Sequence, residues 1–128
     1  MKIFYCVIIL ILFSSLSFSQ NRNSNWCFGD SAGIDFSNVT TPSVFQTSVS
    51  GRGTCVSIAD SIGQLLFYAF TDGKSLGRSG RLYNNQHLLM QGGDSLIAVT
   101  TYNEFVIIPK PGSSNLYYLF HVGVVYSG

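Results

Sequence analysis

Two stretches of this sequence decide the fold: TCVSIADSIGQLLFYAF at Thr54–Phe70 and EFVIIPKPGSSNLYYLF at Glu104–Phe120. Each contains two runs rich in β-branched and aromatic residues, a composition that favours strands. The predicted strands are Thr54–Ala59, Leu65–Thr71, Glu104–Ile108 and Leu116–Val122. The segments between them, DSIGQ and PKPGSSN, hold turn-forming residues, so each stretch predicts a β-hairpin. Weaker strand signals lie at Arg81–Tyr83 and His87–Met90.

The two hairpins align with each other without a gap when Thr54 is laid on Glu104. Five identities result: Val56 with Val106, Ile58 with Ile108, Leu66 with Leu116, Tyr68 with Tyr118, and Phe70 with Phe120. All fall at even positions, and alternate residues share one face of a strand, so we expect one repeated face, with Tyr68 and Tyr118 in the core. The alternative left open is that any two apolar hairpins align this well.

A period of about 50 residues with several strands per unit is typical of propeller-like arrays. The sequence therefore predicts an all-β fold in which antiparallel hairpins form about two blades of a β-propeller-like array. Closed propellers typically have about 4–8 blades, and an open pair would leave strand edges unpaired. The chain ends directly after a strand, so we expect an incomplete array: a fragment of a larger protein, a truncated reading frame, or a chain whose edge needs a partner.

The N-terminal segment predicts a signal peptide over residues 1–19. Lys2 precedes an unbroken apolar run, IFYCVIILILF, and a small polar stretch follows it. That run is shorter than the roughly 20 residues of a membrane span, and Ser17 and Ser19 suit cleavage before Gln20. The alternative is an uncleaved N-terminal anchor. The predicted domains are the signal peptide and a partial β-propeller-like domain at 20–128, with no stable membrane span after cleavage and a secreted or cell-surface location.

Charge excludes several classes of function. The chain has 7 basic and 6 acidic residues, and removal of Lys2 with the signal peptide leaves 6 of each. This balance argues against a nucleic-acid binder and against an acidic disordered tail. An exported chain would also carry two cysteines, Cys27 and Cys55, in an oxidising compartment. They are candidates for a disulfide, or else two reduced thiols buried as small apolar residues.

Four motifs in order cover nearly the whole mature chain: WCFGDSAGIDFS (Trp26–Ser37), GRGTCVSIADSIGQLLFYAFTDG (Gly51–Gly73), YNNQHLLMQGGDSL (Tyr83–Leu96) and VIIPKPGSSNLYYLF (Val106–Phe120). Together they resemble the N-terminal propeller-like region of exported Bacteroidetes proteins, whose longer members often end in a type IX secretion sorting domain. The resemblance implies export and a propeller-type β domain more than an activity. The chain departs from the pattern at Cys27, where an aromatic residue is usual, at Ala69–Phe70, and in carrying no sorting domain.

The residues available for chemistry do not form a recognisable catalytic pattern. His87, His121 and the two cysteines lie too far apart in sequence for a structural zinc motif, so we expect no metal site, no cofactor and no catalytic residue. His87 is expected to cap a turn or to pack beside Met90, and His121 to end a strand half-exposed. Most aspartates sit in turn-like contexts. The candidate interaction surface comprises Trp26, Asp30, Tyr83 and Tyr102.

These observations predict an exported, non-enzymatic β-propeller-type module for extracellular or cell-surface interaction, with an unidentified protein or glycan as its partner. The alternative is part of a glycan-acting hydrolase whose catalytic residues lie in further blades.

Overall fold

The computed structural model describes residues 21–51, 53–72, 79–94, 96–98 and 105–122, and within these ranges the chain is all-β, with eight strands and no helix. The strands are β1 (Asn25–Phe28), β2 (Ala32–Asp35), β3 (Ser43–Gln46), β4 (Cys55–Ala59), β5 (Leu65–Thr71), β6 (Gly80–Asn84), β7 (Phe105–Pro109) and β8 (Tyr117–His121). The predicted signal peptide lies outside the described residues.

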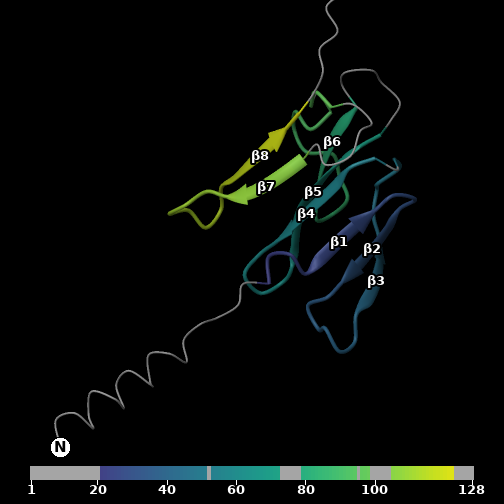
Figure 1. Ribbon diagram of the computed structural model, residues 1–128, viewed down its shortest axis with the longest axis vertical. Coiled ribbons are helices and arrows are strands. Elements are labelled where there is room, and N and C mark those ends of the chain that lie inside the picture. Colours follow the sequence, from purple (N-terminus) through teal and green to yellow (C-terminus); the bar gives the residue numbers. More distant parts are fainter. Residues whose placement is uncertain (1–20, 52, 73–78, 95, 99–104, 123–128) are drawn as a thin grey trace, which may run out of the picture.

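The strands form three small antiparallel sheets, each built from consecutive strands (Figure 1). Sheet A is β1–β2–β3, sheet B is β4–β5–β6, and sheet C is the hairpin β7–β8. The first strands lie next to one another, β1 beside β4 and β4 beside β7. The all-β prediction is confirmed, but the described chain holds three sheets where two hairpin units were expected.

Sheet A is the element that sequence patterning missed. Its strands have only four residues each, which is too short for a clear alternating pattern. The β1–β2 turn contains two residues with positive φ, Asp30 at 59° and Ser31 at 64°. The backbone of Ser31 also pairs with the chain beyond β3, donating to Val49 O at 2.9 Å and accepting from Thr47 N at 2.9 Å. This pairing fixes the tip of the β1–β2 hairpin.

The hairpin loops in sheets B and C form where turn chemistry predicts them. Asp60 Oδ1 accepts hydrogen bonds from the backbone N–H groups of Ile62 and Gln64, both at 2.9 Å, and Gly63 takes a φ of 94°. In the other loop Gly112 has a φ of 75°, and Lys110 N donates to Leu116 O at 2.9 Å. The predicted strands agree with β4, β5, β7 and β8 to within one residue at each end.

The central part of the chain gives one confirmation and one correction. The weak signal at Arg81–Tyr83 lies within β6. The signal at His87–Met90 is not a strand: His87 has a φ of 61° in a turn, and Leu89 forms only an isolated bridge with Tyr83. The turn position of His87 agrees with the sequence prediction, but its ring lies against Tyr68 and Phe45.

Sheet B lies between the other two sheets and is covered on both faces. One face packs against sheet A in a cluster made of Cys27, Val49, Tyr68 and Phe70, with Phe45, Cys55, Leu65 and Tyr83 at its margin. The other packs against sheet C in a cluster made of Ala69, Ala98 and Phe105, with Val56, Leu82, Leu96 and Leu119 at its margin. In sheet A the Phe45 ring lies directly against the backbone of Gly33, where a Cβ atom would be only 2.5 Å from the ring.

The buried Tyr68 hydroxyl belongs to a polar group within the A–B interface. It accepts a hydrogen bond from Ser48 N at 3.0 Å and lies 3.1 Å from His87 Nδ1. Burial raises the pKa of Tyr68. Its ring stacks on Tyr83, with centroids 5.8 Å apart. A buried phenol with partners on its hydroxyl fixes how sheet B meets the β3 side of sheet A.

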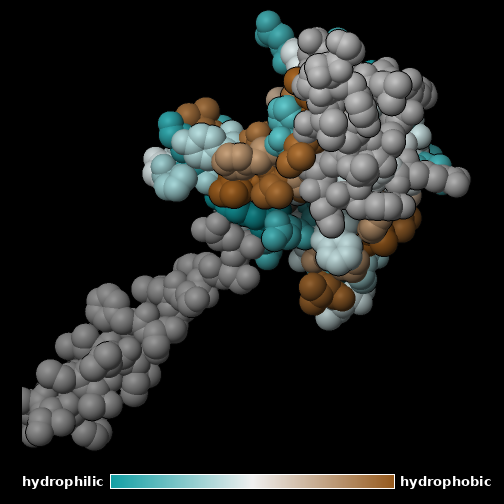
Figure 2. Space-filling view, turned by 45° about the horizontal axis from the view of Figure 1, so that its top comes forward, coloured by the Kyte–Doolittle hydropathy of each residue, from teal (hydrophilic) through white to brown (hydrophobic). Residues whose placement is uncertain are grey.

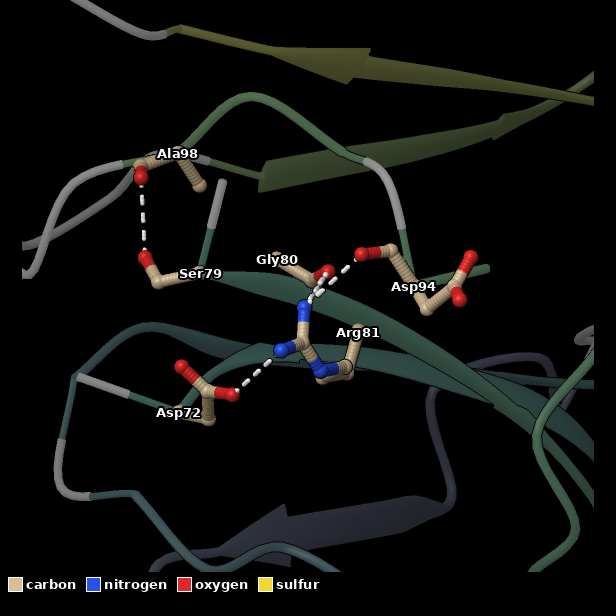
Figure 3. A network of polar contacts seen from close by, with 6 residues as sticks. All are labelled: Asp72, Ser79, Gly80, Arg81, Asp94 and Ala98. Atoms are coloured by element: carbon tan, nitrogen blue, oxygen red, sulfur yellow. Dashed lines mark hydrogen bonds and ion pairs between the residues drawn. The ribbon is translucent and has the colours of Figure 1, made fainter. Parts of the chain in front are cut away.

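Polar contacts tie sheet B to the segment that leads toward sheet C (Figure 3). Arg81 forms an ion pair with Asp72 at 2.8 Å and donates to Asp94 O at 2.9 Å. Ser79 Oγ donates to Ala98 O at 2.8 Å. These contacts hold residues 94 and 96–98 against β6, where Leu96 and Ala98 enter the B–C cluster.

The predicted repeat is correct for the first strand of each hairpin and wrong for the second. The alignment places the first and last residues of β7 (Phe105–Pro109) opposite the first and last residues of β4 (Cys55–Ala59). However, Val56 pairs with Ala69, whereas Val106 pairs with Phe120, one position beyond the matching residue. The β4–β5 pairing shifts by one residue at a bulge between Ile58 and Ala59, whereas the β7–β8 pairing runs without a shift, and this difference separates the two registers.

A shift of one residue moves side chains to the other face of the sheet, and the two tyrosines demonstrate it. Tyr68 is 0% exposed, as predicted, but Tyr118 is 46% exposed and the prediction that it packs in the core is wrong. In sheet B, Tyr68 and Val56 lie on opposite faces, while in sheet C Tyr118 and Val106 share one face.

Candidate interaction surface

The outer face of sheet C is apolar and uncovered in the described part of the chain. The odd-numbered residues of β7 face sheet B, with Phe105 buried, and the even-numbered residues face away. The exposed apolar side chains of this face and of the adjoining loop end are Val106, Ile108, Leu116, Tyr118 and Phe120. Figure 2 shows hydrophobic residues gathered on this hairpin.

The outer face of sheet A, at the other end of the stack, is also apolar. The register places Trp26, Ile34 and Val44 in one row across the three strands, and Phe28 follows Trp26 along β1. Trp26, Phe28 and Val44 are exposed. The indole is held in place, because its Nε1 donates to Asn23 O at 2.9 Å and its ring meets Phe36 edge-on at 5.1 Å.

Two such faces on one small chain are informative, since large contiguous apolar patches on soluble proteins mark interaction sites. Scattered apolar residues on a surface need no explanation, but these side chains share a sheet face and are ordered by strand register. We call the two surfaces the A face and the C face.

The predicted interaction residues fall in different places. Trp26 lies on the A face, and Asp30 lies at the tip of the β1–β2 hairpin, exposed and adjacent to that face. Tyr83 is half-buried and packs against Tyr68 and Phe70 at the A–B interface. Tyr102 lies outside the described residues. The structure thus brings Trp26 and Asp30 to one end of the stack and separates Tyr83 from them.

The C face is the feature that sequence reasoning missed, although a signal for it exists. Residues 105–108 read Phe-Val-Ile-Ile, so both the odd-numbered and the even-numbered positions are apolar. Such a run is typical of a strand that is covered on both faces. Within the described residues only one face of β7 is covered. The sequence pattern therefore indicates that a further element covers the other.

Cys27 and Cys55 lie together where the first strands of sheets A and B meet. Both line a cleft of about 550 Å³ between β1 and β4, and both are free thiols. The hydrogen bond from Cys55, and a second from Ser57, lower the pKa of Cys27 despite its burial. The same pairing, followed by burial, raises the pKa of Cys55. The structure places the two cysteines at one site, and the disulfide itself stays a prediction.

The histidines take structural positions in this geometry. His87 lies beside Tyr68. His121 ends β8 as predicted but is exposed where half-exposure was expected, and its Nδ1 lies 2.8 Å from Ile97 O. Among the described residues, no group of three His, Cys, Asp or Glu side chains is placed to hold a metal ion. The same residues include no helix long and apolar enough to cross a membrane.

No match to this chain is found among protein-family models, curated proteins or solved structures. The resemblance to exported Bacteroidetes proteins therefore stays a prediction, and the proposals below rest on the geometry of the sheets.

Proposed function

We propose that this chain is an exported, non-enzymatic β-propeller-type module that binds another protein through its A and C faces. The observation that carries the proposal is the pair of ordered, exposed apolar faces at the two ends of the stack. The adjacency of the first strands β1, β4 and β7 supports the propeller-type arrangement, in which successive sheets pack face to face. The predicted signal peptide supports export to the cell surface or the medium.

A protein suits these faces better than a glycan does. The C face presents valine, isoleucine and leucine side chains beside Tyr118 and Phe120, and burial of such side chains favours a dry, complementary apolar surface. A sugar would bring hydroxyl groups that the aliphatic side chains cannot satisfy. The partner we expect therefore presents a β-sheet face of similar character.

Site-specific photo-crosslinking in expressing cells tests this function. A photoreactive phenylalanine analogue at Tyr118 places the probe on the C face, and the same analogue at Ile62 is the matched control on an exposed loop. We expect a discrete protein adduct from position 118 and none from position 62. Equal labelling from both positions, or adducts from neither, would refute the proposed function. An adduct that contains saccharide and no protein would replace the protein partner with a glycan.

A further inference from the structure

The partner of the C face can be inferred from the equivalence of β4 and β7. In each strand the odd-numbered residues face the preceding sheet and the even-numbered residues face away from it. Val106 and Ile108 therefore hold the places that Val56 and Ile58 hold in sheet B. Ile58 is 3% exposed, whereas Ile108, the same residue type in the matching place, is 45% exposed.

The internal B–C interface shows what covers such a face. The first strand of the next sheet supplies an aromatic residue, Phe105, which is buried with Ala69 and packs beside Val56. An aliphatic residue on the first strand of one sheet, Val56, thus meets an aromatic residue on the first strand of the next, Phe105. The C face repeats the aliphatic half of this interface and lacks the aromatic half within the described residues.

The aromatic half lies at the opposite end of the same chain. In sheet A, Cys27 faces sheet B, so Trp26 and Phe28 of the first strand face away from it, toward the position of a preceding sheet. Trp26 and Phe28 therefore have the orientation that Phe105 has in sheet C. One chain carries both halves of a B–C type interface, and within one chain they lie on opposite outer sheets.

We propose that the partner is a second copy of this chain, bound head to tail, with the C face of each copy packed on the A face of the other. The described residues form three sheets, so two copies give six such sheets, within the range of about four to eight that close a propeller. Because the interface joins two different surfaces, a dimer closes into a ring only when the A face and the C face of each copy are both bound. This inference rests on the proposed function and names its partner.

Packing two C faces against each other is the alternative arrangement, and the internal interfaces argue against it. Neither the A–B nor the B–C interface joins two equivalent faces. In each, the face that one sheet turns toward the next sheet in the chain packs against the face that the next sheet turns back toward it. The net charge expected for the mature chain is zero, so two copies meet without net repulsion.

The molar mass in solution tests the inference, measured by light scattering on the chain as an expressing cell exports it. We expect a dimer at micromolar concentration. Ile108→Lys on the C face and Val44→Lys on the A face should each raise the Kd at least about 30-fold and give monomers, because a lysine is placed in an apolar interface. Ile62→Lys, an equally drastic change on an exposed loop, should leave the dimer intact.

Mixing the two monomeric variants decides the orientation. The Ile108→Lys chain keeps a native A face and the Val44→Lys chain keeps a native C face, so the mixture should recover a dimer held by one native interface. A dimer of Val44→Lys alone, or a mixture that stays monomeric while both variants keep the parental circular dichroism, would overturn head-to-tail pairing. Native chain that stays monomeric at far higher concentration, or that forms open polymers, would overturn the closed dimer.

The two proposals fail separately. A monomer whose Tyr118 probe crosslinks to a different protein overturns the second-copy partner and leaves the interaction module in place. A chain without adducts and without self-association overturns both.

Discussion

Oxidation of the Cys27–Cys55 pair should strongly stabilise the chain. The two thiols influence each other's pKa, and both line the cleft between β1 and β4, through which we expect an external oxidant to reach them. The Cys27 thiolate, favoured by its lowered pKa, attacks a disulfide of the oxidant and releases one thiolate. Cys55 then loses its proton and attacks the Cys27 sulfur, which releases the second thiol and leaves the intramolecular bond.

The magnitude follows from the loop that the bond closes. The segment between Cys27 and Cys55 contains β2 and β3, and so most of sheet A. The loop-entropy relation gives about 3.6 kcal/mol at ordinary temperature for a loop of roughly 28 residues. For a domain of this size, that corresponds to a rise in Tm of about 15 °C.

The assay compares thermal unfolding of the exported chain with and without dithiothreitol, together with alkylation and intact mass. We expect no alkylation before reduction, two alkylated thiols after it, and a Tm that falls by about 15 °C on reduction. A Cys27→Ser, Cys55→Ser double variant should show no dependence on the reductant. Two thiols that alkylate in the folded, unreduced protein after exposure to oxidised glutathione would refute the reasoning.

Three other predictions concern packing and charge. Phe105→Asp puts a charge in the B–C cluster and should cost at least about 4 kcal/mol, whereas Phe120→Asp on the C face should change the unfolding free energy of the monomer by less than about 1 kcal/mol in urea titrations. Arg81→Met removes the ion pair to the largely buried Asp72 carboxylate and should cost about 2 kcal/mol by the same measurement. Burial raises the pKa of Tyr68, so the folded state holds the phenol proton more tightly than the unfolded state does. The contribution of this group to the free energy of unfolding is therefore full below about pH 10 and falls as the pH rises further. A Tyr68→Phe variant whose stability falls equally over the same pH range would contradict this.

Local sequence signals predict a good part of this fold. Alternating apolar residues, with Asp60 and Gly112 at the turns, placed the two hairpins to within one residue at each strand end. These features depend on the chemistry of a few neighbouring residues, which a sequence displays directly. The four-residue strands of sheet A depend instead on packing against sheet B, where Cys27 and Phe45 enter a cluster built mainly by distant residues.

Which face of the second hairpin is buried could not be predicted from the repeat alone. The identities at even positions are real, but the β4–β5 pairing shifts by one residue at a bulge between Ile58 and Ala59, and the β7–β8 pairing does not. Tyr118 therefore shares the open face of its sheet with Val106. A bulge in one of the two hairpins is not visible in an ungapped alignment of their sequences. The alignment therefore predicts Tyr118 in the core, although Tyr118 lies on the exposed C face.

The orientation of sheet C on sheet B is the claim on which the whole account depends, and nuclear Overhauser contacts to the Ala69 methyl group test it most directly. We expect cross-peaks from the ring protons of Phe105 to that methyl, since both lie in the B–C cluster, and none from the ring of Tyr118. Cross-peaks from Tyr118 to Ala69, with none from Phe105, would show that the opposite face of β7–β8 is buried and would remove the basis for both proposals.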